Sequence, residues 1–210
     1  MKTKVMAIFA TLIVALSVAG IVYAHWTDSV QIEGTVHMGE LIVGILDIKS
    51  IEDSDDLTKD PCDTTVTLDD PQTSVHHDPP QTVYHEMYVT VDNGYPQYWV
   101  KIKFDLKNAG TIPAHIIALT IVDIPGDEEL VWQYDPLTDT WEGKDPITLD
   151  PIINLYIRKQ SGAPLVCNQL EPCTDEPCDL WFELKQPAKE CHTYDFKIHI
   201  EAIQWNKYVP

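Results

Sequence analysis

The chain has 210 residues, enough for a leader segment and one domain with a substantial core. It carries 33 Asp and Glu residues against 14 Lys and Arg residues, which gives a net charge of −19. Binding to nucleic acid or to an anionic membrane surface requires basic patches, so this composition argues against both. It is compatible with high solubility and with binding of divalent cations.

Residues 1–24 have the layout of a secretory signal peptide. Lys2 and Lys4 form a short positive region, an apolar run follows over residues 5–22, and Val22-Tyr23-Ala24 fits a cleavage site. The alternative is a transmembrane anchor, because about 18 apolar residues can just span a bilayer. Polar residues follow the site at once without a positive cluster, which favours cleavage. We therefore expect a secreted, extracellular protein that begins at His25, carries a net charge of −21 and has no membrane attachment.

The segment His25–Val36 is predicted to be a short amphipathic strand. Its odd-numbered positions are polar. Its even-numbered positions, here called the apolar parity, carry Trp26, Val30, Ile32 and Val36 and are interrupted by Asp28 and Gly34. It could be an ordinary edge strand of its own domain. It could instead be a donor strand, which pairs with an open sheet edge of the next subunit and adds core side chains to it. Such head-to-tail contacts do not close on themselves, so they build filaments.

Period-two alternation dominates the remaining chain, and helical periodicity is not found there. The clearest strand is Tyr98–Lys107, in which every even position is apolar or aromatic. Leu41–Ile48 and Ile116–Ile124 are apolar on both faces, which predicts central strands. Further strands are expected at Val83–Val91, Ile152–Arg158, Asp179–Gln186 and Thr193–Trp205, with weaker candidates at Thr64–Leu68 and Leu130–Tyr134. Fifteen prolines, placed largely in loops, agree with short strands broken by turns.

These patterns predict an all-β fold, an antiparallel β-sandwich of about eight or nine strands. In the last strand the apolar parity shifts after Ile200 to Ile203 and Trp205, which indicates either a β-bulge or the end of the strand. Two segments lack the period-two alternation and are expected to be loops, an acidic loop at about residues 49–81 and a Cys- and Pro-rich loop at about 161–177. Both are expected as excursions from one domain that spans residues 37–210.

All five cysteines are disulfide candidates in an exported chain: Cys62, Cys167, Cys173, Cys178 and Cys191. Their spacing lacks the C-x2-C pairs of a zinc ribbon. Two bridges would leave one thiol to pair between subunits or to stay free, and the sequence does not choose among the pairings. A hairpin of Asp179–Gln186 with Thr193–Trp205 would place Cys178 at its base and Cys191 near its tip, which disfavours that pair.

Clusters of carboxylates make calcium the ligand that the sequence favours most, although no cofactor is required. Hard cations bind several oxygen ligands from flexible loops. The candidates are Asp53, Asp55 and Asp56; Asp69 and Asp70; Asp127, Glu128 and Glu129; and Asp135, Asp139 and Glu142. None of them has the EF-hand spacing, so each cluster alone is also consistent with a solvated turn.

No catalytic motif is found. His85-Glu86 begins the H-E-x-x-H zinc motif, but Val89 occupies the position of the second histidine. Nucleophile-elbow, P-loop and dinucleotide-binding patterns do not occur. An N-terminal His25 leaves a copper site of the histidine-brace type as an enzymatic alternative. We expect a protein that is not an enzyme.

Three stretches resemble the TasA/camelysin-like family: HWTDSVQIEGTVHMGEL at 25–41, YWVKI at 98–102 leading into NAGTIPA at 108–114, and IHIEAIQWN at 198–206. That family includes bacterial biofilm fibre subunits and archaeal bundling pilins. The resemblance implies a jelly-roll-like sandwich, secretion, and polymerisation through an N-terminal donor strand. The acidic segment and the Cys-rich loop depart from the family pattern, so the filament type stays open.

We therefore expect a structural subunit that joins copies of itself into a helical extracellular homopolymer for cell–cell or surface adhesion and biofilm matrix, with bundling as a further contact between filaments. Two alternatives remain. One is a secreted metalloenzyme, with the copper site at His25 or a camelysin-like protease activity. The other is a monomeric calcium-binding domain on the cell surface.

Overall fold

The computed structural model describes residues 6, 8–17, 39–54, 62–124, 130–166, 168–186 and 188–207. The chain divides into two units, Met1–Met38 and Gly39–Pro210. In the first unit residues 8–17 form a short helix. Of the helical residues described, none belongs to a helix that is long and apolar enough to cross a membrane. The predicted donor strand His25–Val36 lies outside the described residues.

The second unit consists of antiparallel strands. They are β1 (Val43–Asp53), β2 (Asp63–Ser74), β3 (Gln81–Gly94), β4 (Trp99–Asn108), β5 (Ala114–Asp123), β6 (Val131–Asp135), β7 (Thr140–Lys144), β8 (Pro151–Lys159), β9 (Gln169–Leu170), β10 (Asp175–Leu184) and β11 (His192–Gln204), followed by a 3-10 turn at Trp205–Lys207. All of them belong to one sheet with the order β6-β7-β8-β10-β4-β1-β3-β11-β5-β9, and β2 pairs with β3. The prediction of an antiparallel all-β fold is confirmed.

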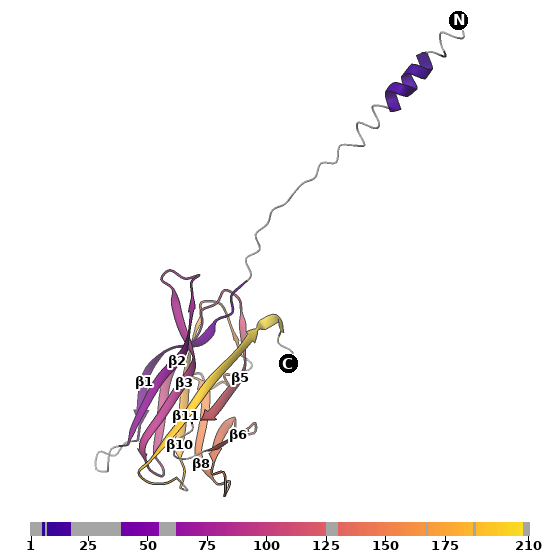
Figure 1. Cartoon of the computed structure of the whole chain (residues 1–210). Helices are drawn as coiled ribbons and strands as arrows, with labels where there is room; N and C mark the ends of the chain where they lie inside the picture. The colour runs from indigo at the N-terminus through magenta and orange to yellow at the C-terminus, as the bar shows by residue number, and fades with distance from the viewer. Residues whose placement is uncertain are drawn as a thin grey trace. The chain divides into compact units, whose positions relative to one another are not determined.

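The sheet curls back on itself at β3, forming a half-barrel. The register between β1 and β3 is the single pair Ile45 with Tyr84, whereas β11 pairs with β3 from Glu86 to Gly94. β3 therefore connects two halves of the sheet, one made of β6, β7, β8, β10, β4 and β1, and the other made of β2, β3, β11, β5 and β9. Its partner changes from β1 to β11 within about two residues. Figure 1 shows β3, β11 and β5 passing over β10 and β8, which belong to the other half.

The core lies between the two halves. Phe182 on β10 and Phe196 on β11 meet edge to face, with ring centroids 5.4 Å apart. From Tyr98, which precedes β4, along the strand the alternation predicted from the sequence is confirmed, because Tyr98, Val100, Ile102, Phe104 and Leu106 are all buried. Apolar side chains of β8, β10, β3, β5 and β11 form one large hydrophobic cluster in this interior, and a second, small cluster consists of Ile42, Val83 and Ala109.

Some details differ from the sequence predictions. β10 and β11 do not form a hairpin, because β10 inserts between β4 and β8 while β11 lies between β3 and β5. β7 and β9 were not predicted, and β2 fills much of the segment expected to be an acidic loop. Of the two explanations left open for the parity shift in the last strand, the structure favours the β-bulge, since the register of β11 with β5 shifts between Glu201 and Ala202 and the strand continues to Gln204.

Replacing Phe182 with alanine is expected to lower the free energy of unfolding by about 3–5 kcal/mol, because it leaves a cavity where the two halves meet. Chemical denaturation followed by tryptophan fluorescence measures this change. Leu137→Ala is the matched control, because Leu137 is 94% exposed, and it should change stability by less than about 0.5 kcal/mol. Equal effects of the two changes would contradict the position of the core.

Candidate assembly site

One long edge of β5 has no strand neighbour for most of its length in the described part of the chain. β5 pairs with β11 over Ala114–Asp123, but with β9 only at Ala114 and His115. The backbone of Ile116 also donates to the carbonyl of Asn168 at 3.2 Å. Beyond this point the edge presents backbone N–H and C=O groups of the kind that another strand can pair with.

This edge lacks the usual protection against strand addition. From Ile116 to Val122 the sequence is IIALTIV, without a charged residue or a proline. Proteins commonly blunt exposed edges with charges and prolines. The edge strand β2 follows that rule, because it contains Asp63, Asp69, Asp70 and Pro71. The contrast marks the β5 edge as a surface suited to receive another strand.

An apolar pocket of about 260 Å³ lies beside this edge. It is lined by residues of β5, the β6–β7 hairpin, β8 and the segment after β8: Ile117, Ala118, Leu119, Tyr134, Asp139, Trp141, Ile157, Leu165 and Val166. The rings of Tyr134 and Trp141 pack against each other with centroids 5.2 Å apart. The pocket thus lies in the seam between the two halves of the curled sheet, where side chains of an added strand would enter. We refer to the β5 edge from Ile116 to Val122 together with this pocket as the assembly groove.

The single carboxylate in the pocket lining is already paired. Asp139 accepts a hydrogen bond from the Tyr134 hydroxyl at 2.8 Å and one from Arg158 Nε at 3.4 Å. Arg158 also donates to the Thr138 carbonyl at 3.0 Å, and its guanidinium lies over the ring of Tyr156 at 4.8 Å. Because its charge is balanced by Arg158, Asp139 does not oppose an apolar occupant of the pocket.

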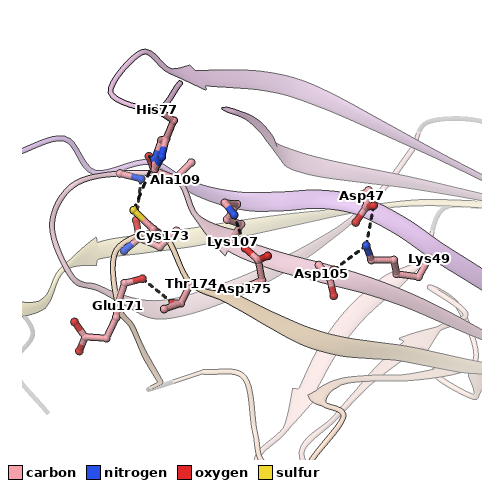
Figure 2. Close-up of polar contacts among 12 residues, drawn as sticks. Asp47, Lys49, His77, Asp105, Lys107, Ala109, Glu171, Cys173, Thr174 and Asp175 are labelled. Atoms are coloured by element: carbon pink, nitrogen blue, oxygen red, sulfur yellow. Dashed lines mark hydrogen bonds and ion pairs between the residues drawn. The ribbon is translucent and has the colours of Figure 1, made fainter. Parts of the chain in front are cut away.

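Lysines of β1, β4 and β8 are paired with carboxylates within the subunit. Lys49 lies 3.0 Å from both Asp47 and Asp105, as Figure 2 shows, and Lys107 lies 2.6 Å from Asp175. Three further pairs are Lys101 with Asp179, Lys103 with Glu52 and Lys159 with Glu176. Because these cations are used within the subunit, the excess of acidic residues is left to be balanced by ions from solution.

The predicted calcium ligands are not brought together in the part of the chain that the structure describes. No three His, Cys, Asp or Glu side chains among the described residues are arranged to hold a metal ion. Asp70 lies 3.2 Å from His85, Glu142 pairs with Lys144, and Asp135 accepts hydrogen bonds from Leu137 N and Thr138 Oγ1. The Leu137 backbone bond is the main reason that the pKa of Asp135 is lowered. Asp53 ends β1 and Asp69 lies in β2, while Asp55, Asp56, Asp127, Glu128 and Glu129 lie outside the described residues.

The cysteines fall into two classes, and no disulfide joins Cys173, Cys178 and Cys191. Cys62 and Cys178 are buried, whereas Cys173 and Cys191 are exposed. Burial raises the pKa of the Cys178 thiol to about 12. Cys167 lies outside the described residues.

Sequence reasoning did not find the assembly groove. It proposed the donor segment, with Trp26, Val30, Ile32 and Val36, and these residues lie outside the described ones. It interpreted Ile116–Ile124 as a central strand, and this is wrong for the described part of the chain, because β5 has a full-length neighbour on one side only. The charge-free run from Ile116 to Val122 was the signal that could have drawn attention to the edge.

Comparison with known proteins gives no match of any kind: no family model, no curated protein and no solved structure matches the chain.

In the reduced, unpolymerised chain, iodoacetamide is expected to alkylate Cys173 and Cys191 at neutral pH and to leave Cys62 and Cys178 unmodified until the protein is unfolded. The pKa of Cys178 near 12 adds to its protection, because the thiolate is the reactive form and would appear only in strongly alkaline solution. Peptide mass mapping after timed quenching measures the modification at each site. Alkylation of Cys178 as fast as that of Cys173 would contradict the predicted burial.

Proposed function

We propose that the protein is a structural subunit of an extracellular filament that polymerises head to tail. In this proposal the arm His25–Val36 of one copy adds as a strand to the assembly groove of the next copy. The observation that carries the proposal is the uncharged, proline-free edge of β5 beside an apolar pocket. The half-barrel is then a jelly-roll-like sandwich that becomes complete only when a neighbour's arm fills the seam.

The arm and the groove are complementary in pattern. The apolar parity of the arm, Trp26, Val30, Ile32 and Val36, would face the pocket, and its polar parity would face solvent. The eight residues from Ile116 to Asp123 extend over about 26 Å at about 3.3 Å per residue, and the twelve residues of the arm can span that edge. Backbone pairing would supply affinity and the pocket would select the register.

The energies involved favour a long-lived contact. Full burial of a large apolar side chain contributes about 1.5–3 kcal/mol, so four such residues contribute on the order of 6–12 kcal/mol. Each new ladder hydrogen bond adds a net of about 0.5–1.5 kcal/mol. Association costs about 4–15 kcal/mol in lost freedom of motion. Burial and ladder hydrogen bonds together can exceed the cost of association, so the arm can hold two subunits together. Loss of one of the four apolar contacts should be enough to prevent polymerisation.

The extracellular setting is supported by the signal-peptide layout of residues 1–24 and by the resemblance to the TasA/camelysin-like family. That family also suggests the role of the filament, in cell–cell or surface adhesion and biofilm matrix, with bundling between filaments. The partners of the protein are then copies of itself.

A charge in either partner of the contact is expected to abolish filaments. Ile32→Asp places a carboxylate on the apolar parity of the arm, and Ile117→Asp places one in the lining of the groove. Each variant alone should stay monomeric in negative-stain electron microscopy and in sedimentation. An equimolar mixture should form dimers and nothing longer, because one intact arm can enter one intact groove.

Val75→Asp is the matched control, because Val75 is 73% exposed and lies outside the groove, and this variant should polymerise normally. Deletion of His25–Val36 should also abolish filaments, and a synthetic peptide of that sequence should then bind the truncated chain one to one. Ordered filaments from the deletion variant would show that the arm is an ordinary surface strand and would overturn the proposal.

Calcium is expected to promote polymerisation, because subunits with a net charge of −21 repel one another at close contact and Asp-rich segments offer oxygen ligands. Light scattering during assembly should rise faster in millimolar calcium chloride than in sodium chloride of the same ionic strength. If the two salts act equally, a specific calcium site is wrong and charge screening alone explains the effect.

A further inference from the structure

The two exposed thiols lie at opposite ends of the sheet. Cys173 precedes β10, and its backbone N–H donates to the carbonyl of Asn108, the last residue of β4, at 2.9 Å. Cys191 precedes β11, whose first residue His192 pairs with Gly94 at the turn that leads into β4. One thiol therefore marks each end of β4, which has ten residues.

These positions exclude a bond between the two thiols of one subunit. Ten residues of extended strand span about 30 Å. A disulfide requires Cα atoms no more than about 7 Å apart. Burial of Cys62 and Cys178 leaves Cys173 and Cys191 as the accessible thiols in the described part of the chain.

Both exposed cysteines have unusual and well-defined backbone conformations. Their φ angles are +62° for Cys173 and +55° for Cys191, in the left-handed region that non-glycine residues rarely adopt. Such conformations persist where the surrounding structure enforces them, and they are often found at functional positions. Each thiol thus sits on a tightly turned segment at the entrance to a long strand.

Cys173 also has a hydrogen-bond donor beside its sulfur. His77 Nε2 lies 2.9 Å from the Ala109 carbonyl, so this nitrogen carries the proton, and it lies 4.0 Å from Cys173 Sγ. Figure 2 shows the imidazole of His77 and the sulfur of Cys173 directed toward one another next to Ala109. This N–H is donated to the Ala109 carbonyl, so the imidazole fixes the surroundings of the sulfur without binding it strongly.

We propose that Cys173 of one subunit and Cys191 of the next form a disulfide that locks the polymer covalently. The inference rests on the proposed function, because head-to-tail stacking brings one end of a subunit to the opposite end of its neighbour. A repeated contact of this kind uses both exposed thiols of the described residues once per subunit. The chain would then carry its cross-link between subunits instead of within the fold.

The reaction uses a low-molecular-weight disulfide as oxidant. The Cys173 thiolate attacks one sulfur of that disulfide, the sulfur–sulfur bond breaks, and one small thiol leaves after taking up a proton. The Cys191 thiolate of the neighbour then attacks Sγ of Cys173 and displaces the second small thiol. Two protein thiols are oxidised to one disulfide, and one small disulfide is reduced to two small thiols.

Filaments of the mature chain treated with oxidised glutathione provide the test. Non-reducing denaturing gels should show a ladder of dimers, trimers and longer species that collapses to monomer with reductant, and peptide mapping should find Cys173 joined to Cys191. Cys173→Ser and Cys191→Ser should each give monomer alone and a single dimer band when mixed. Cys167→Ser is the matched control and should keep the full ladder.

Filaments that are visible in the microscope but give no ladder would overturn the cross-link and leave the proposed function intact. A chain that forms neither filaments nor a ladder would overturn both. Cys173 joined to Cys167 of the same chain, or Cys173 joined to Cys173 of another, would also overturn the cross-link, the latter because it requires a head-to-head contact.

Discussion

A sheet edge must find partners for its backbone N–H and C=O groups, and this requirement at β5 governs the account of this protein. Water can meet it, but the edge from Ile116 to Val122 has seven consecutive uncharged residues and exposes the apolar side chain of Val122. The edge strand β2 avoids this problem with Asp63, Asp69, Asp70 and Pro71. β5 has no such device between Ile116 and Val122, and the proposed donor strand would cover it. This difference between the two edges is the basis of the proposed strand addition at β5.

The rest of the fold presents this edge in a fixed position. Pairing with β11 along the whole of β5 holds the edge straight except at the bulge between Glu201 and Ala202. The contact between Phe182 and Phe196 holds the two halves of the sheet together, and the seam between β5 and the β6–β7 hairpin leaves the pocket. Ion pairs such as Lys101 with Asp179 stabilise the outer face and consume cations within the subunit. The exposed thiols then mark the two ends at which neighbouring subunits would meet.

Strands with one buried face could be predicted from the sequence, because burial imposes an alternation that a short window reveals. Tyr98–Lys107 is the clearest case. The phase shift before Ile203 marked the position of the irregularity for the same reason, but only the register shows that it is a bulge. β7 was missed because Thr140–Lys144 contains Gly143 and shows no alternation. The hairpin of β10 with β11, considered only as a possibility, does not form, because β10 enters the sheet between β4 and β8 although consecutive strands usually pair.

The candidate site was harder to predict for a related reason. Ile117, Trp141 and Leu165 line one pocket but come from three distant parts of the chain, so no local pattern connects them. The apolar run of β5 was interpreted as a central strand, since an apolar run alone does not show whether a strand has one neighbour or two. The sequence could identify a candidate donor segment by its parity, but only the pairing of strands revealed an edge to receive it.

Hydrogen exchange of the backbone amides of β5 tests the central claim most directly. In the assembled protein, edge amides between Ile117 and Val122 should exchange at least tenfold more slowly than in the chain that lacks His25–Val36, because a neighbour's strand binds them. Amides of the β2 edge should exchange at the same rate in both samples. Unchanged exchange along β5, or new protection along β2 instead, would contradict the account.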